Sequence, residues 1–363
     1  MQKLPVAILG ATGAVGQRFI QLLLDHPWFE VAEVIGSDRT AGKLYGEGAR
    51  WVLDGEIPEL VRGMRVKGLD EDFTSPLVFS ALPKEAADPR EIELAAAGHI
   101  VCTNAAVNRM VEDVPLLLPE VNADHLRLVD VQRANRGWTT GALVANSNCT
   151  AMPGVMALAP LRVFGIDRVS IVSMQAVSGA GYPGVASLDI LDNVVPYIGG
   201  EEDKVETETR RMLGALVEDK VEWLDAAVGA SCNRVPIVDG HMVNISFSLR
   251  EQPPMEDILL AWAEFRGPDP IPSLPSAPAQ PVVYLPQADR PQVRRDRATG
   301  QGMTTSVGRL RECPVLGYKF AALSHNTVRG AAGCSILNAE LMAVKGYING
   351  FQPEGTADLV AAH

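Results

Sequence analysis

The chain has 363 residues, of which 47% are apolar and 21% charged, and its formal net charge at pH 7 is −12. The length predicts two domains, and the composition is typical of a globular protein and excludes general disorder. An acidic protein is a poor partner for nucleic acid, so any site for anionic ligands must gather its positive charge locally.

No apolar run reaches the roughly 20 residues that a membrane span requires, and Met1–Pro5 leads into a short apolar strand without a signal peptide. The five cysteines are widely spaced and form no Cys-x-x-Cys pair. This spacing predicts neither disulfides nor a bound metal. We therefore expect a cytoplasmic protein without a membrane partner.

The first hundred residues alternate between strand-like and helix-like patterns. Apolar runs predict strands at 5–9, 31–35, 77–81 and 99–102, and amphipathic spacing predicts helices at 14–26 and 88–97. Strand–helix–strand units of this kind predict a doubly wound parallel sheet of the Rossmann type.

A glycine-rich loop joins the first strand to the first helix. It comprises Gly10, Ala11, Thr12, Gly13, Ala14, Val15 and Gly16. Glycine lets the backbone turn tightly and approach a pyrophosphate, which then faces the helix amides. Because the loop lies between an apolar strand and an amphipathic helix, it predicts a dinucleotide site.

The residues after the second strand distinguish NAD from NADP. Ser37, Arg39 and Thr40 can donate hydrogen bonds to a 2′-phosphate, whereas Asp38 favours NAD unless it points away or caps the next turn. We expect NADP.

Cys149 follows the strand-like Leu143–Ala145 and precedes a helix predicted over 151–163, with Pro153 in its first turn. A cysteine at a helix N-terminus is expected to have a lowered thiol pKa, and the helix amides could hold a tetrahedral oxyanion. The other four cysteines lack this context and are expected to be packing residues.

Longer β-rich runs follow at 169–174, 243–249 and 305–310, and they predict a mixed sheet in a second α/β domain. Prolines and glycines between 268 and 291 predict a surface excursion, and 330–347 predicts an apolar helix. Of the six histidines, His241, just before a long strand, is the leading candidate for a general base. A structural role is equally compatible with its position, and His325 is a weaker rival.

Six motifs in order make the chain resemble the aspartate-semialdehyde dehydrogenase family over essentially its whole length. They are Gly10–Gly16, Ser147–Cys149, Gln175–Gly179, Glu201–Lys204, Arg234 with His241, and His325–Gly333. The resemblance implies a thioester on Cys149, a substrate oriented by Gln175 and an acid/base role for His241. It implies further roles for the following residues: Arg234 would bind the substrate α-carboxylate and Glu201 its α-ammonium group; Arg109, Lys204 and Asn148 would bind phosphate; Ser178, Gly179 and Asn326 would contact the cofactor.

The implied reaction is the NADPH-dependent reductive dephosphorylation of L-β-aspartyl phosphate to L-aspartate 4-semialdehyde, in lysine, methionine and threonine biosynthesis. A malonyl-CoA or related acyl-CoA reductase of the same fold is the nearest alternative. An N-acetyl-glutamyl-phosphate reductase fits less well, because its Pro-Gly-Cys-Tyr-Pro motif differs from Ser147–Thr150. A nucleotide-sensing protein without catalysis would be expected to lack part of the chemical set.

We expect a cofactor domain of residues 1–145 plus 325–363 and a catalytic and dimerisation domain of residues 146–324. The resemblance further implies a homodimer or homotetramer.

Overall fold

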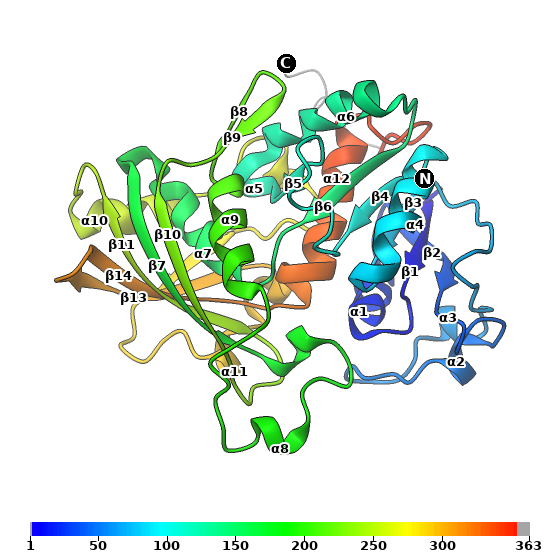
Figure 1. Ribbon diagram of the computed structural model, residues 1–363, viewed down its shortest axis with the longest axis horizontal. Helices are drawn as coiled ribbons and strands as arrows, with labels where there is room; N and C mark the ends of the chain where they lie inside the picture. Colours follow the sequence, from blue (N-terminus) through cyan, green and yellow to red (C-terminus); the bar gives the residue numbers. More distant parts are fainter. Residues whose placement is uncertain (1, 354–363) are drawn as a thin grey trace.

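The computed structural model describes residues 2–353. His363, and the part of the predicted cofactor domain from 354 onward, lie outside the described residues. Two sheets of six strands each dominate this part of the chain, with one small hairpin beside them (Figure 1).

The first sheet contains only parallel neighbours, as predicted. Its order is β2 (Phe29–Ile35), β1 (Leu4–Leu9), β3 (Leu77–Ser80), β4 (Ile100–Thr103), β6 (Ala142–Asn146) and β5 (Leu116–Leu117). Every residue of β3, β4 and β6 is buried, which is typical of parallel strands covered on both faces.

Helices cover this sheet. α1 (Ala14–Leu23) follows the glycine loop, and α4 (Lys84–Ala96) begins four residues before the predicted start at 88, because Pro83 already occupies the cap position. The chain returns near its end as α12 (Gly333–Val344), which packs on β3, β4 and β6. A π-helical turn, η6 (Val328–Ala332), precedes it.

The second sheet is mixed, also as predicted. Its order is β10 (Ala227–Arg234), β7 (Ile166–Gln175), β11 (His241–Leu249), β14 (Gly317–Ser324), β13 (Thr305–Cys313) and β12 (Val282–Leu285). The outer pairs are parallel and the inner pairs antiparallel. β12 corrects one expectation, since part of the predicted surface excursion is an edge strand hydrogen-bonded to β13.

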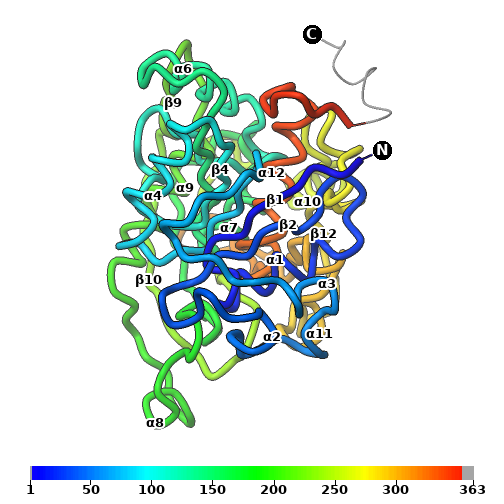
Figure 2. Tube along the Cα trace, turned by 90° about the vertical axis from the view of Figure 1, so that its right-hand side faces the viewer, coloured from blue at the N-terminus to red at the C-terminus, as the bar shows by residue number. Residues whose placement is uncertain are grey.

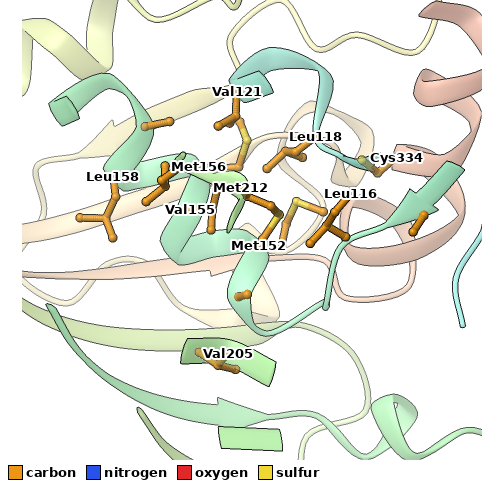
Figure 3. Close-up of a cluster of buried hydrophobic side chains, with 14 of the residues drawn as sticks. Leu116, Leu118, Val121, Met152, Val155, Met156, Leu158, Val205, Met212 and Cys334 are labelled. Carbon is orange, nitrogen blue, oxygen red and sulfur yellow. The ribbon is translucent and has the colours of Figure 1, made fainter. Parts of the chain in front are cut away.

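The core between the sheets is built on α7 (Ala151–Leu158), all of whose residues are buried. Its Met152, Val155 and Met156 meet Leu116 and Leu118 from the first sheet's edge (Figure 3). The α-helix ends earlier than predicted because a proline follows Ala159, and the chain continues as the 3-10 turn η2 (Ala159–Phe164).

The remaining elements are shorter. They are α2 (Tyr45–Gly48), α3 (Glu59–Arg62), α5 (Pro119–Asn122), η1 (Ala123–Arg127), α6 (Leu128–Arg136), η3 (Val177–Ala180), α8 (Ser187–Ile190), α9 (Glu201–Met212), β8 (Ala215–Val217), β9 (Lys220–Glu222), α10 (Met255–Glu264), η4 (Ile271–Ser273), α11 (Val293–Asp296) and η5 (Thr299–Gly302). α8 lies at the tip of an arm that extends away from the sheets in both views (Figure 2). No helix between residues 2 and 353 is long and apolar enough to cross a membrane.

Candidate active site

Cys149 lies in the short connection between β6 and α7, where the two sheets meet, and it is partly exposed. Gly330 of η6 packs directly on it: a β-carbon added at Gly330 would lie 2.7 Å from the Cys149 β-carbon. The other four cysteines are buried and unpaired, as expected of packing residues.

Three amides at the start of α7 donate hydrogen bonds to Asn148. Asn148 caps the helix, because its side-chain Oδ1 accepts hydrogen bonds from the amides of Thr150 (2.7 Å) and Ala151 (3.0 Å). The Asn148 carbonyl accepts a third, from the amide of Met152 at 3.1 Å. These three amides are therefore already engaged by Asn148, which argues against their holding an oxyanion.

The expected lowering of the Cys149 pKa is also wrong. Burial among the surrounding atoms, and then the charge of Glu201, raise the thiol pKa to about 11. Arg109, the hydroxyl of Thr150 and Arg234 act in the opposite direction but do not outweigh these two effects. The thiol is accordingly protonated at neutral pH.

Helix α9 brings a carboxylate to this loop. Glu201 Oε1 accepts hydrogen bonds from Asn148 Nδ2 and Thr150 Oγ1, both at 3.0 Å. The ammonium of Lys204 lies 3.6 Å from the other carboxylate oxygen. Three predicted site residues, Asn148, Glu201 and Lys204, thus lie together. Glu201 is only 8% exposed, and its carboxylate is hydrogen-bonded to the loop that carries Cys149.

Glu208 is a residue that the sequence analysis missed. One of its carboxylate oxygens pairs with Arg109 Nη1 at 3.1 Å and the other accepts the Asn148 amide at 2.7 Å. Burial raises the pKa of Glu208. A signal existed, because residues 201, 204 and 208 follow the spacing of one helix face.

Arg234 ends β10, in register with Gln175 at the end of β7. It is 7% exposed, and Nη1 donates to the Ala176 carbonyl at 2.7 Å. Between residues 2 and 353, no carboxylate lies within 4.0 Å of its guanidinium. The charge of Glu201 acts on Arg234, but no direct ion pair satisfies this buried guanidinium, which favours an anion site.

His241, the first residue of β11, is fully buried, and its Nδ1 accepts a hydrogen bond from the Ala176 amide at 3.1 Å. Burial, followed by the charge of Arg234, lowers the pKa of His241 to about 3. Gly179 covers the ring: a β-carbon there would lie 3.0 Å from His241 Nε2 and 2.9 Å from Arg234 Nη1. The charge of His325 also disfavours protonation of His241, and the charge of Asp239 acts on His325 in turn.

The glycine loop has the geometry of an anion site. Gly10 adopts φ +70°, and a β-carbon at Gly16 would lie 2.2 Å from the Gly10 oxygen, so both positions require glycine. The cap residue of α1, Gly13, makes no side-chain cap hydrogen bond, which leaves the first amides of the helix for a ligand. These residues fit a dinucleotide pyrophosphate.

A cleft joins this loop to the second sheet. Ala14, Ser178, Tyr182 and Thr327 are among its lining residues. Asn326 Nδ2 donates to Ser178 Oγ at 2.8 Å, and its Oδ1 accepts the Gly240 amide at 2.7 Å.

Ser37 and Arg39 are exposed at the end of β2, where Thr40 Oγ1 donates to the Ser37 carbonyl. Lys43, which the sequence analysis did not name, donates to the Arg39 carbonyl at 2.9 Å. Lys43 therefore adds a positive charge beside Ser37, Arg39 and Thr40.

Two family models match the chain. Residues 5–129 match the NAD binding domain of semialdehyde dehydrogenases, and residues 158–329 match their dimerisation domain. The chain is 47% identical to the aspartate-semialdehyde dehydrogenase of Archaeoglobus fulgidus (93% of this chain, 97% of the relative) and 45% identical to that of Aspergillus fumigatus (94% and 97%). A crystal structure of aspartate-semialdehyde dehydrogenase with NADP from Candida albicans superposes with a TM-score of 0.87 at 38% identity (96% of this chain, 100% of that one). These relatives give no support to the acyl-CoA reductase alternative.

Proposed function

The chain belongs to the aspartate-semialdehyde dehydrogenase family, and on this premise we propose that it reduces L-β-aspartyl phosphate to L-aspartate 4-semialdehyde with NADPH and releases phosphate. The reaction is reversible and supplies lysine, methionine and threonine biosynthesis.

One observation carries the choice of substrate: the buried guanidinium of Arg234, which has no carboxylate partner in residues 2–353, lies close enough to Cys149 to lower its thiol pKa. A substrate α-carboxylate would supply the missing charge, and the planar guanidinium suits two parallel hydrogen bonds. Gln175, in register with Arg234, would orient the reacting carbonyl at the thiol.

The phosphate would bind beside the loop that carries Cys149. Arg109 and Lys204 supply positive charge there, and Asn148 lies between their two carboxylate partners, Glu208 and Glu201. Glu201 would attract the substrate α-ammonium group.

In the biosynthetic direction, the Cys149 sulfur would attack the acyl phosphate and form a thioester as phosphate departs. NADPH, when bound, supplies the hydride that reduces this thioester. His241 would act at the oxygen of the resulting thiohemiacetal, whose collapse releases the aldehyde and the sulfur. Arg234 would hold the substrate in place throughout.

The protein's cofactor is NADP. The proposed contacts are the Gly10, Thr12, Gly13, Ala14, Val15 and Gly16 loop for the pyrophosphate; Ser37, Arg39 and Thr40 for the 2′-phosphate; and Ser178, Gly179 and Asn326 for the nicotinamide end. The uncapped start of α1 and the shared cleft support these assignments.

We also propose that residues 1–145 and 325–363 form the cofactor domain and 146–324 the catalytic domain. The packing of α12 on the first sheet supports this division. A homodimer or homotetramer is proposed because the matched model is that of a dimerisation domain. A cytoplasmic location agrees with five unpaired cysteines.

Two parallel assays test the function. The first follows phosphate-dependent reduction of NADP by aspartate semialdehyde, and the second follows oxidation of NADPH with malonyl-CoA. We expect turnover only in the first. Turnover with malonyl-CoA alone would refute the proposal.

A further inference from the structure

We propose that Glu208 and Arg211 of α9 are positioning residues for Arg109, and that together they set the affinity of the active site for phosphate. Neither residue touches the substrate, and both act through the place that they give to the Arg109 guanidinium. This inference rests on the proposed function, in which Arg109 binds phosphate.

The two residues share one face of a helix beside the nucleophile. α9 packs on α7, the helix that follows Cys149 (Figure 1). Glu208 and Arg211 are three residues apart, so their side chains lie on the same face of α9. Both are charged residue types that are almost completely buried, with exposed fractions of 1% and 3%. Charged side chains are rarely buried to this extent, and such burial calls for specific partners.

Glu208 joins the Arg109 side chain to the loop that carries the nucleophile. Its Oε1 accepts a hydrogen bond from Arg109 Nη1 at 3.1 Å, and its Oε2 accepts one from the Asn148 amide at 2.7 Å. Asn148 directly precedes Cys149, so one buried carboxylate fixes the guanidinium relative to the sulfur. Hydrogen bonds to a charged group are stronger than those between neutral groups, which makes this bridge rigid.

Arg211 holds the backbone of the segment that carries Arg109. Residues 104–115 contain no helix or strand, so other contacts must fix their position. Arg211 Nη1 donates to the Arg109 carbonyl at 2.9 Å. Its Nη2 donates to three further carbonyls of the segment, those of Val111 (2.9 Å), Glu112 (3.3 Å) and Val114 (2.8 Å). Since both terminal nitrogens of this buried guanidinium serve one segment, its burial is explained by the position that it gives to Arg109.

The positioned Arg109 retains a donor for a ligand. Its Nη2 donates to the Asn104 carbonyl at 2.7 Å, whereas its Nε is buried and has no hydrogen-bond partner within residues 2–353. A buried donor without an acceptor is costly, and a phosphate oxygen would satisfy it. The charge of Arg109 also reaches the nucleophile, because it acts to lower the pKa of the Cys149 thiol.

Phosphate enters the oxidative direction of the reaction only in its second half. In the first half, the Cys149 thiol adds to the aldehyde carbon, His241 accepts the hydroxyl proton, and hydride passes from that carbon to NADP, which leaves a thioester. In the second half, a phosphate oxygen attacks the thioester carbon, the carbon–sulfur bond breaks, and the sulfur leaves with the electron pair and takes a proton. The position of Arg109 therefore affects the second half and not the first.

Two variants of the full-length protein test the inference. Glu208→Gln keeps an acceptor for the Asn148 amide but removes the charge that pairs with Arg109, and Arg211→Lys keeps the buried charge but loses donors to the segment. We expect each to raise the KM for phosphate about tenfold and to change the KM for aspartate semialdehyde by less than about twofold.

Arg210→Lys is the matched control on the same helix. The Arg210 guanidinium lies over the Trp223 ring, and its Nε donates to the Leu224 carbonyl, so it does not hold the Arg109 segment. Both KM values of this variant should equal those of wild type.

The first turnover without phosphate separates positioning from general damage to the site. We expect the burst of NADPH formed from NADP and aspartate semialdehyde to keep its wild-type rate within about threefold in both variants, because thioester formation does not involve Arg109. A burst that slows as much as the phosphate-dependent step would show a merely structural role and overturn the inference. A lower KM for phosphate in Glu208→Gln would overturn it as well, because Glu208 would then compete with phosphate for Arg109.

An Arg109→Ala background tests whether the two residues act through Arg109. There, neither substitution should lower kcat/KM for phosphate further, and additive losses would contradict the inference. If Arg211→Lys does not fold, as judged by urea titration, Glu208→Gln decides. If wild type shows phosphate-dependent activity but the variants keep its KM for phosphate, only this inference fails. If wild type lacks that activity, the proposed function fails.

Discussion

Gly330 of the π-helical turn packs on Cys149, which ties the position of the sulfur to a segment 181 residues further along the chain. A methyl group at Gly330 would lie 2.7 Å from the Cys149 β-carbon, closer than real contacts allow, and 3.0 Å from its α-carbon. The backbone of Cys149 would have to shift.

We therefore expect Gly330→Ala to lower kcat by roughly 100-fold, because displacement of a reacting atom by about 1 Å has an effect of this size. NADP binding, measured by fluorescence titration, should stay within about twofold of wild type. Gly63→Ala is the matched control, since nothing lies within 4 Å of a β-carbon there. Wild-type kcat in Gly330→Ala would mean that the contact does not position the nucleophile.

The Cys149 thiol should react as an ordinary protonated thiol at neutral pH. Because burial raises the pKa of this thiol to about 11, the fraction of thiolate increases about tenfold with each unit of increasing pH, up to that value. The rate of alkylation by iodoacetamide should accordingly rise about tenfold per unit from pH 7 to 10. Mass spectrometry of a Cys313→Ser background isolates the signal, because the pKa of Cys313 is lowered by the amides of Leu316 and Val315.

Cys149→Ala in the same background is the control for that measurement and should also abolish turnover while NADP still binds. A rate that reaches a plateau near pH 7 would show a low thiol pKa and would support the lowered value predicted from the helix N-terminus.

Substitution of Arg234 should raise the KM for aspartate semialdehyde more than the KM for phosphate. Arg234→Lys keeps the charge but loses paired hydrogen bonds, so we expect KM for aspartate semialdehyde to rise about 10- to 100-fold. KM for phosphate should change less than about threefold. Arg109→Lys is the matched comparison and should show the reverse pattern in steady-state kinetics. A rise in both constants in each variant would argue against separate carboxylate and phosphate pockets.

Glu120 and Arg329 form a fully buried ion pair, with two hydrogen bonds of 2.8 Å, that anchors η6 to α5. Glu120→Ala leaves a buried guanidinium unpaired and should lower the free energy of unfolding by about 3–5 kcal/mol in urea titrations. The double variant Glu120→Met/Arg329→Met removes both charges and should be more stable than Glu120→Ala. If the single variant were the more stable one, the pair would not be the anchor.

His125 should make the protein less stable in acid. Burial lowers its pKa to about 4, below the ordinary value of about 6.5. As the pH falls from 6.5 toward 4, the unfolded chain binds a proton that the native state does not, so stability falls by up to about 1.4 kcal/mol per pH unit. His241 and His325 act in the same direction, whereas Glu91 and Glu208, whose pKa values are raised, act in the opposite one.

Urea unfolding between pH 7 and 5 measures this dependence. The variant His125→Gln should have a shallower slope than wild type, because it removes one titrating group. Its stability at pH 7 does not test the pKa, because the substitution also removes the contact between His125 Nδ1 and Asn122 Nδ2, which lie 3.0 Å apart. Identical slopes for the two proteins would show that His125 titrates normally in the native state.

The sequence by itself determined the features that depend on local physical chemistry. Apolar runs predicted the parallel strands, and the spacing of Gly10, Gly13 and Gly16 predicted a tight turn that no other residue fits at its first and last positions. The place of Cys149 between a strand and a helix also followed from neighbouring residues. The functional roles of the site residues rest on family motifs and remain predictions.

Only the tertiary structure decided the chemistry around Cys149. The pKa of its thiol depends on burial and on the charge of Glu201, which is 52 residues away along the chain. The Asn148 side chain accepts hydrogen bonds from the helix amides that we had expected to face the sulfur. Electrostatic and hydrogen-bond energies depend on distance in space, and packing sets that distance, so no local pattern in the sequence contains them.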